Sequence, residues 1–230
     1  MNMLSPSPPH HRTIFAVDIE GSTTRNNTAK GDLRGAMYAL LEQALRANGI
    51  DEDFCDPLVD RGDGILALIR PLDEVPKTLL LSKVVPSLRE LLLDHEVRNP
   101  GQRLRLRAVL HAGEVHHDLR APFGEALDVA FRLLDAPEVK QRFRLVADPL
   151  LLVVSDWIYR TIVRQGYEGI DEQMFQPVTQ VVVHDVVYPG WAYLPDAPAA
   201  AEVPGMLGRL SASARLMHAS RRFEERGHVV

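Results

Sequence analysis

Short apolar runs alternate with longer amphipathic segments along this chain. Runs rich in β-branched and aromatic residues predict strands over 13–17, 65–69, 103–110 and 150–154. Apolar residues at helical spacing predict helices over 32–48, 77–97, 124–135 and 155–164, with a shorter helix from Pro137. The order strand, helix, strand, strand, helix, strand predicts an α+β fold, a ferredoxin-like two-layer sandwich with helices on an antiparallel-rich sheet.

Capping and turn residues predict where these elements end. Asp32 is the expected N-cap of the first helix, and Gly49 is its expected C-terminal cap. Pro86 should break or restart the second helix, because proline removes a helical hydrogen bond. The pair Pro189 and Gly190 predicts the turn of a terminal hairpin.

Length and composition bound the class of protein. The 230 residues fit one substantial domain, expected over 12–195, after a disordered lead-in at 1–11 and before a linker and helical tail at 196–230. The net charge of −5 argues against a general nucleic-acid or membrane-surface binder. No apolar stretch has the length of a membrane span. The single cysteine, Cys55, excludes an intrachain disulfide and suits a reducing cytoplasm.

Two aspartates stand at strand ends. Asp18 follows the apolar run 13–17, and Asp63 lies in the glycine-flanked turn formed with Gly62 and Gly64. Carboxylates on adjacent strand ends can hold hard divalent cations through oxygen ligands. The structural alternative for each acid is a turn residue, a common role of aspartate.

Four segments, taken in order, resemble the catalytic domain of the class III nucleotidyl cyclases, with the closest likeness to divergent actinobacterial members. The likeness covers roughly 12–194 and rests on the segments 15–23, 62–64, 110–115 and 123–133. Such cyclases draw the ribose 3′-hydroxyl of a nucleoside triphosphate onto its α-phosphate, and pyrophosphate leaves. The resemblance implies a homodimer in which each site combines residues of both subunits.

The resemblance also implies a cofactor set of two divalent cations, Mg²⁺ or Mn²⁺. Asp18 and Asp63 would bridge both ions, and the backbone carbonyl of Ile19 would add a ligand. The metal-facing turn at Gly62 and the backbone N–H groups that follow Asp18 would contact the nucleotide. These N–H groups belong to Gly21, Ser22, Thr23 and Thr24.

A second group of residues aligns with positions that act on the ribose and the α-phosphate. Arg132 matches the family arginine that stabilises transition-state charge, usually from the partner subunit. Asp128 stands where the family has an asparagine that orients the ribose. The alternative for both is an ion pair on a helix surface, because the two residues are four positions apart.

Three departures concern the base and the triphosphate. Val59 and Ala121 occupy the positions of the lysine and aspartate with which purine cyclases read adenine, so an apolar or water-lined slot is expected. The family lysine that contacts the triphosphate falls on His184, which is cationic only when protonated. The base is therefore open and includes a pyrimidine, as in cyclases of bacterial anti-phage (antiviral) defence.

Two functions are compatible with this pattern. The first is a cytoplasmic nucleotide cyclase, a lyase that produces a cyclic nucleotide signal. The alternative is a cyclase-fold module with little turnover that binds a nucleotide and signals to a partner, with the C-terminal tail as a docking segment. Histidines 111, 116 and 117 are expected to be exposed or hydrogen bonded, and arginines 103, 105 and 107 to lie on a solvated strand face.

Overall fold

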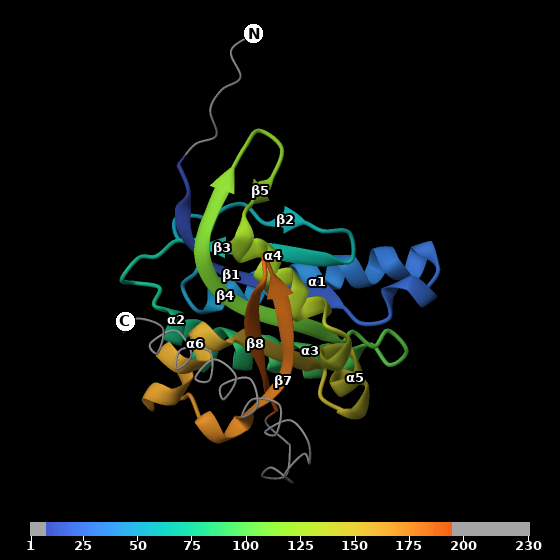
Figure 1. Ribbon diagram of the computed structural model, residues 1–230. Coiled ribbons are helices and arrows are strands. Elements are labelled where there is room, and N and C mark those ends of the chain that lie inside the picture. Colours follow the sequence, from blue (N-terminus) through green and yellow to red (C-terminus); the bar gives the residue numbers. More distant parts are fainter. Residues whose placement is uncertain (1–7, 195–230) are drawn as a thin grey trace, which may run out of the picture. The chain divides into compact units, whose positions relative to one another are not determined.

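The computed structural model describes residues 8–194 (Figure 1). Within them one eight-stranded sheet has the order β2-β3-β1-β4-β6-β8-β7, and β5 pairs with β4 outside this path. Its strands are β1 (His10–Ile19), β2 (Val59–Asp60), β3 (Gly64–Ile69), β4 (Leu106–His117), β5 (Pro122–Phe123), β6 (Leu150–Ser155), β7 (Phe175–Val183) and β8 (Val186–Tyr193). All pairs are antiparallel except β4 with β6. The predicted α+β class and antiparallel-rich sheet are confirmed.

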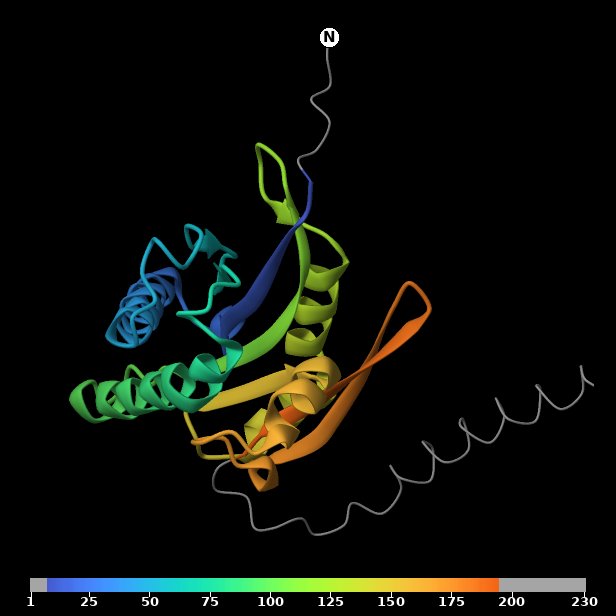
Figure 2. The same ribbon diagram turned by 90° about the vertical axis from the view of Figure 1, so that its left-hand side faces the viewer.

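Helices cover both faces of the central strands. Figure 2 shows α1 (Asn27–Ala47) and α3 (Val85–Arg98) on one side of β1 and β4, and α4 (Glu125–Asp135) on the other. The remaining helices are α2 (Lys77–Leu79), α5 (Pro137–Leu145) and α6 (Asp156–Thr161). No helix of residues 8–194 is long and apolar enough to cross a bilayer.

Strand alternation divides the side chains of β1 between these two faces. Phe15, Val17 and Ile19 belong to the large core that α1, α3 and α6 share with the sheet. Ile14 and Ala16 are equally buried but point to the opposite face, and Asp18 follows them there. The last inward position on the α4 side of the strand is therefore a carboxylate.

Several predicted boundaries are corrected. Helix α1 begins at Asn27 because the side chain of Asn26, not Asp32, accepts the capping bond, from the N–H of Ala29. The predicted restart at Pro86 is confirmed, since a new helix, α3, begins at Val85 and has Pro86 in its first turn. A π-helical segment, Leu80–Val84, precedes it.

The terminal hairpin also turns elsewhere than predicted. The turn is His184 and Asp185, whose positive φ angles of 45° and 64° match a two-residue hairpin. Pro189 and Gly190 lie inside β8, and Gly190 is buried against Leu133 of α4. Strand β4 is longer than predicted, since it continues from Leu106 through His117.

Gly64 allows β1 and β3 to approach closely at the acidic end of the sheet. A Cβ atom there would lie 2.6 Å from the carbonyl oxygen of Val17. We expect Gly64→Ala to lower the free energy of unfolding by about 1–3 kcal/mol, because rigid backbone must move. Gly35→Ala, in open space on α1, is the matched control and should stabilise by about 0.5–1 kcal/mol. Equal denaturant midpoints for the two variants would contradict this packing.

Candidate functional site

The antiparallel register of β1 and β3 brings the two predicted acids to one end of the sheet. Asp18 lies opposite Gly64, and the N–H of Ile19 donates to the carbonyl oxygen of Asp63 at 2.9 Å. Gly62 adopts a φ of +82°, which the turn before Gly64 requires. Two carboxylates predicted from separate motifs are therefore neighbours, and the charge of Asp63 acts on Asp18.

Asp18 is held by an arginine from the adjacent strand. An Nη of Arg107 donates to its Oδ2 at 2.6 Å, and the two residues are register partners on β1 and β4. Burial raises the pKa of the Asp18 carboxyl, although Arg107 opposes this shift. Its other oxygen, Oδ1, is buried and has no hydrogen-bond partner among the described residues. A buried carboxylate oxygen without a donor suits a cation.

Asp63 is oriented from the loop after β1. The hydroxyl of Ser22 donates to Asp63 Oδ2, and Ser22 is buried. Gly21 is in the left-handed conformation that starts this tight turn. The N–H of Thr24 donates to the carbonyl of Gly21 at 3.3 Å, so among the predicted phosphate donors its N–H is already engaged.

Asp18 and Asp63 are the only predicted metal ligands that would act through their side chains, because Ile19 would act through its backbone carbonyl. No group of three or more His, Cys, Asp or Glu in residues 8–194 is placed to hold a metal ion. Asp18 Oδ1 nevertheless fits a cation, because it is desolvated and lacks a donor. A metal here would depend on backbone, water or phosphate oxygens for its remaining ligands, as is usual for Mg²⁺.

An arginine that the sequence analysis missed lies beside the acids. The Arg61 guanidinium carbon is 3.3 Å from the ring centroid of Phe131 on α4. Burial lowers the pKa of Arg61, while the charges of Asp135, Asp18 and Asp63 oppose that shift. Its position next to Gly62 was the available signal, but stacking on a helix distant in sequence could not be foreseen.

The predicted ribose and phosphate residues lie on the outer face of α4. Arg132 is exposed, and its guanidinium donates to the carbonyl of Val182 on β7 at 3.0 Å. This hydrogen bond takes the place of the alternative ion pair with Asp128 on the helix surface. Asp128 is exposed as well. Arg132 therefore points toward the β7–β8 hairpin, whereas Asp18 of the same chain contacts Arg107.

His184 lies at the tip of that hairpin. Its Nδ1 is 3.5 Å from a carboxylate oxygen of Glu125 at the start of α4, and the Tyr188 hydroxyl donates to the same carboxylate at 2.5 Å. The Tyr188 hydrogen bond and, after it, His184 lower the pKa of Glu125. An exposed histidine facing a carboxylate is a weaker anion ligand than the lysine it replaces in the resemblance.

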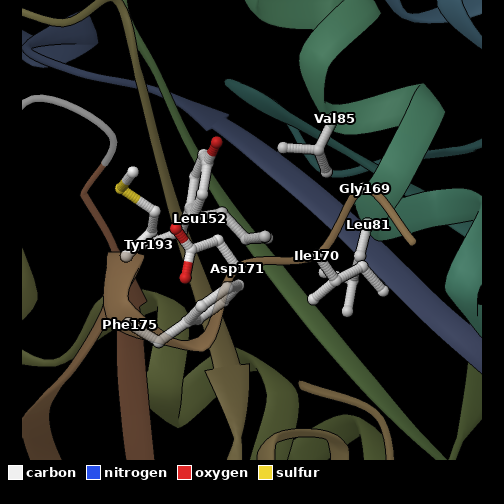
Figure 3. Close-up of a pocket in the computed structure, with 9 residues that line it drawn as sticks. Leu81, Val85, Leu152, Gly169, Ile170, Asp171, Phe175 and Tyr193 are labelled. Carbon is white, nitrogen blue, oxygen red and sulfur yellow. The ribbon is translucent and has the colours of Figure 1, made fainter. Parts of the chain in front are cut away.

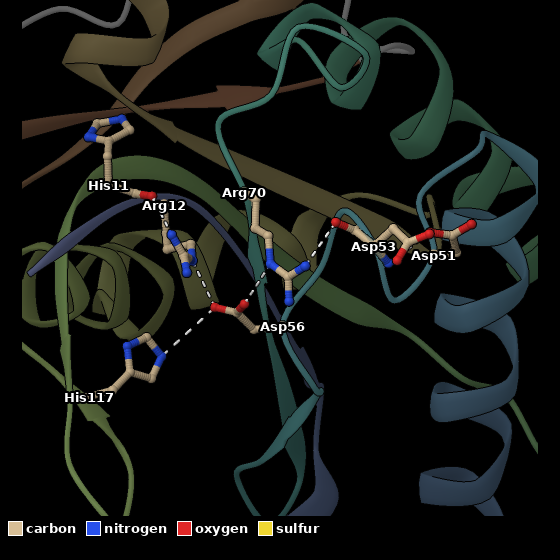
Figure 4. Close-up of polar contacts among 7 residues, drawn as sticks. All are labelled: His11, Arg12, Asp51, Asp53, Asp56, Arg70 and His117. Carbon is tan, nitrogen blue, oxygen red and sulfur yellow. Dashed lines mark hydrogen bonds and ion pairs between the residues drawn. The ribbon is translucent and has the colours of Figure 1, made fainter.

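Val59 and Ala121 do meet in space, as the resemblance requires. Both line an open cavity of about 490 Å³ between β2, the start of β1 and the end of β4. Arg12, Asp56 and His117 add charged and polar groups to a wall that also contains the apolar side chains of Val59, Leu68 and Ala121. Figure 4 shows Arg12 and Arg70 on the Asp56 carboxylate, with N–O distances of 2.7 and 3.1 Å.

The architecture is similar to solved nucleotide cyclases. A guanylyl cyclase, Cya2, has a TM-score of 0.56 at 13% identity, over 87% of this chain and 98% of that one. An adenylate/guanylate cyclase/hydrolase from Silicibacter pomeroyi has a TM-score of 0.56 at 19% identity, over 82% and 98%. The guanylate cyclase domain of RhGC from Catenaria anguillulae, in complex with GTP, has a TM-score of 0.54 at 16% identity, over 80% and 96%. The chain has the nucleotide cyclase fold. No family model and no curated sequence matches it.

Within the cyclase fold, Arg105, which precedes β4, and Arg107, which lies in it, have structural partners. The predicted solvated face is wrong for Arg107, which is buried at 8% exposure against Asp18. Arg105 pairs with Glu20 at 2.7 Å and stacks on Phe143. Alternation along a strand cannot show that its polar face is covered as well. Here α4 and Phe143 of α5 cover the face that carries these arginines.

The histidines of β4 do not form a metal site with other side chains of the described part. His111 is hydrogen bonded, which is one of the two predicted alternatives: it is buried, and its Nδ1 lies 2.8 Å from the hydroxyl of Ser155. His116 stacks on Phe123 across the β4–β5 pair. His116 and His117 belong to β4, which continues past the predicted strand end at residue 110.

A second cavity, of about 360 Å³, lies on the opposite face of the sheet from Asp18. Leu81 and Val85 form one wall, and Phe175 and Tyr193 form another (Figure 3). Leu152, in its floor, belongs to the core on the α3 side. Asp171 also lines this cavity, which the sheet separates from the acidic end described above.

Proposed function

We propose that this protein is a nucleotide cyclase, which converts a nucleoside triphosphate into a 3′,5′-cyclic nucleotide and pyrophosphate. The cyclase fold supports the reaction class. The observation that carries the proposal is the convergence of Asp18 and Asp63 at one sheet end, with Asp18 Oδ1 buried and without a donor. A fold retained as a scaffold that binds neither metal nor nucleotide would not require this unpaired oxygen.

In the proposed reaction, the ribose 3′-oxygen bonds to the α-phosphorus. The bond from that phosphorus to the bridging oxygen breaks, pyrophosphate leaves, and the hydroxyl proton passes to solvent. Divalent cations would lower the pKa of the 3′-hydroxyl and neutralise the triphosphate when bound. Asp18, Asp63 and the Ile19 carbonyl would hold them, and Ser22 and Arg107 would keep the two carboxylates oriented.

The direction of Arg132 supports a site shared by two copies of the chain. Arg132 lies on the exposed face of α4, by the hairpin, while the acids are approached by Arg107 and Arg61 of the same chain. We infer that Arg132 and Asp128 of one subunit serve the acids of its partner in a homodimer. A guanidinium at the α-phosphate would stabilise the charge that develops there.

The base would be read differently from adenine in purine cyclases. The cavity at Val59 and Ala121 is lined by Arg12, Arg120 and His117, which can donate hydrogen bonds. Asp56 is the acceptor in the same wall, and its arginine partners lower its pKa against the effect of burial. A base with carbonyl oxygens, uracil among the pyrimidines, suits these donors.

The alternative function is a nucleotide-binding module that signals to a partner with little turnover. The specific observation in its favour is the ion pair of Arg107 with Asp18, which occupies one oxygen of a proposed metal ligand. Both functions require the nucleotide to bind, so binding alone does not separate them. The proposed partner segment, the C-terminal tail, lies outside the described residues.

Mixing two inactive variants tests the shared site. Asp63→Asn and Arg132→Ala should each lose product formation alone, since each removes one half of every site. The mixed dimer retains one intact site, so we expect roughly a quarter of wild-type turnover, the share from random exchange of subunits. Product is measured as cyclic nucleotide by mass spectrometry. Two variants that stay inactive after verified subunit exchange would contradict a site built from two copies.

A further inference from the structure

A basic cavity of about 230 Å³ adjoins Asp63. It lies between the loop after β1, the first turns of α1 and the turn before β3. Its wall combines one acid, Asp63, with three cations, Arg25, Lys30 and Arg34. Ser22, Thr23 and Gly62 line the same wall, and Ile19 and Leu33 form its apolar part. The cavity therefore adjoins the site of the two aspartates and carries positive charge, whereas that site carries negative charge.

Lys30 carries a positive charge near the N-terminus of α1, where a helix is stabilised by negative charge. It lies in the first turns of α1, where the helix dipole favours acids and disfavours cations. That first turn contains no acid, and Asn26 provides the cap. Arg34 follows four residues later, so two like charges share one helix face, which also destabilises a helix. Helix formation does not explain this arrangement, whereas binding an anion does.

The charges of the cavity are only partly compensated. Arg34 is paired with Asp60, and Arg25 donates to the carbonyl of Arg103 at 3.1 Å. No ion pair or hydrogen bond within residues 8–194 engages the Lys30 ammonium. Lys30 and Arg25 thus supply positive charge that the described protein does not neutralise, beside a carboxylate proposed to hold a metal.

We propose that Lys30 and Arg25 bind the β- and γ-phosphates of the substrate from the same chain that carries Asp18 and Asp63. This inference rests on the proposed function and deepens it. The phosphates would lie between the metal-holding acids and the two cations, and their charge would be matched on both sides. Lys30 thereby supplies the contact that His184, exposed at the hairpin tip and facing Glu125, provides only weakly.

Binding of inorganic tripolyphosphate with Mg²⁺ to the full chain tests this assignment by calorimetry. We expect Lys30→Met to weaken it about tenfold, since a charge-assisted hydrogen bond is lost. Lys30→Arg should restore most of the affinity. Arg46→Met, at the far end of α1, is the matched control and should bind like wild type. Unchanged affinity in Lys30→Met would overturn the proposal.

Nucleotides separate this proposal from the proposed function. Each nucleoside triphosphate should lose affinity in Lys30→Met as tripolyphosphate does, while binding of the monophosphates should be unchanged. For the nucleotide that is turned over, KM should rise with little change in kcat, because the contact is made before and during the reaction. Tripolyphosphate binding that depends on Lys30, without any cyclic product, would support the phosphate site at Lys30 and contradict the proposed cyclase activity. Turnover with a KM that is unchanged in Lys30→Met would support the cyclase activity and contradict the phosphate site at Lys30.

Discussion

Asp63→Asn should reduce formation of cyclic nucleotide by more than about a hundredfold, beyond the effect of losing an outer-shell partner of a metal ligand. The amide keeps the shape and can still accept from Ser22, so the turn is retained. It removes the charge that would hold a cation beside Asp18, and with it the means to lower the pKa of the ribose hydroxyl. The measurement is the initial rate with Mn²⁺ and a saturating nucleotide.

The matched control for this variant is Asp73→Asn, which removes an exposed carboxylate elsewhere. It should retain wild-type turnover. Both variants should unfold at the same denaturant concentration as wild type, which ensures that activity and not folding is compared. If Asp63→Asn forms product at the wild-type rate, Asp63 holds no catalytic metal and the two-metal assignment is wrong.

The free energy of unfolding should fall by roughly 3 kcal/mol as pH is lowered from 6.5 to 4, at 1.36 kcal/mol per unit of pKa shift. Burial, with a smaller effect of His11, lowers the pKa of His111 from 6.5 to about 4. In this pH interval His111 therefore binds a proton in the unfolded chain but stays neutral in the folded chain. This stability is complete above pH 6.5 and is lost as pH falls toward the folded pKa.

Urea unfolding at intervals of pH measures this effect, and His111→Asn removes it. The asparagine can still bond Ser155, so the variant should fold, with a stability that changes less between pH 6.5 and 4. His10→Asn, at an exposed position, should keep the wild-type slope. Equal slopes for wild type and His111→Asn would show that other groups carry the acid sensitivity.

Local sequence signals predicted the parts of the fold that depend on local chemistry. The apolar run before Asp18 and the glycine turn at Asp63 are sufficient to define two strand ends, and antiparallel pairing then makes them neighbours. Ser155, the first residue of the helix predicted over 155–164, is the N-cap of α6 and accepts a hydrogen bond from the N–H of Ile158. The actinobacterial subgroup and the roles of the site residues stay predictions.

Other features depend on contacts between distant segments, which periodicity does not contain. Arg107 looked like part of a solvated face, yet α4 covers that face and leaves Asp18 as its partner. Asp56 and Arg12 line the cavity at Val59 because three separate segments converge there (Figure 4). The hairpin turn was misplaced because Gly190 serves close packing against α4 rather than a turn.

The most direct test of the account is to incubate the purified full chain separately with ATP, GTP, CTP and UTP in the presence of Mn²⁺. Cyclic nucleotide and pyrophosphate are then quantified by mass spectrometry and an enzymatic assay. The account predicts both products in equal amounts from at least one of the four nucleotides, and neither from Asp63→Asn. Absence of a cyclic product from all four, with nucleotide binding intact, would contradict the cyclase and leave a binding module.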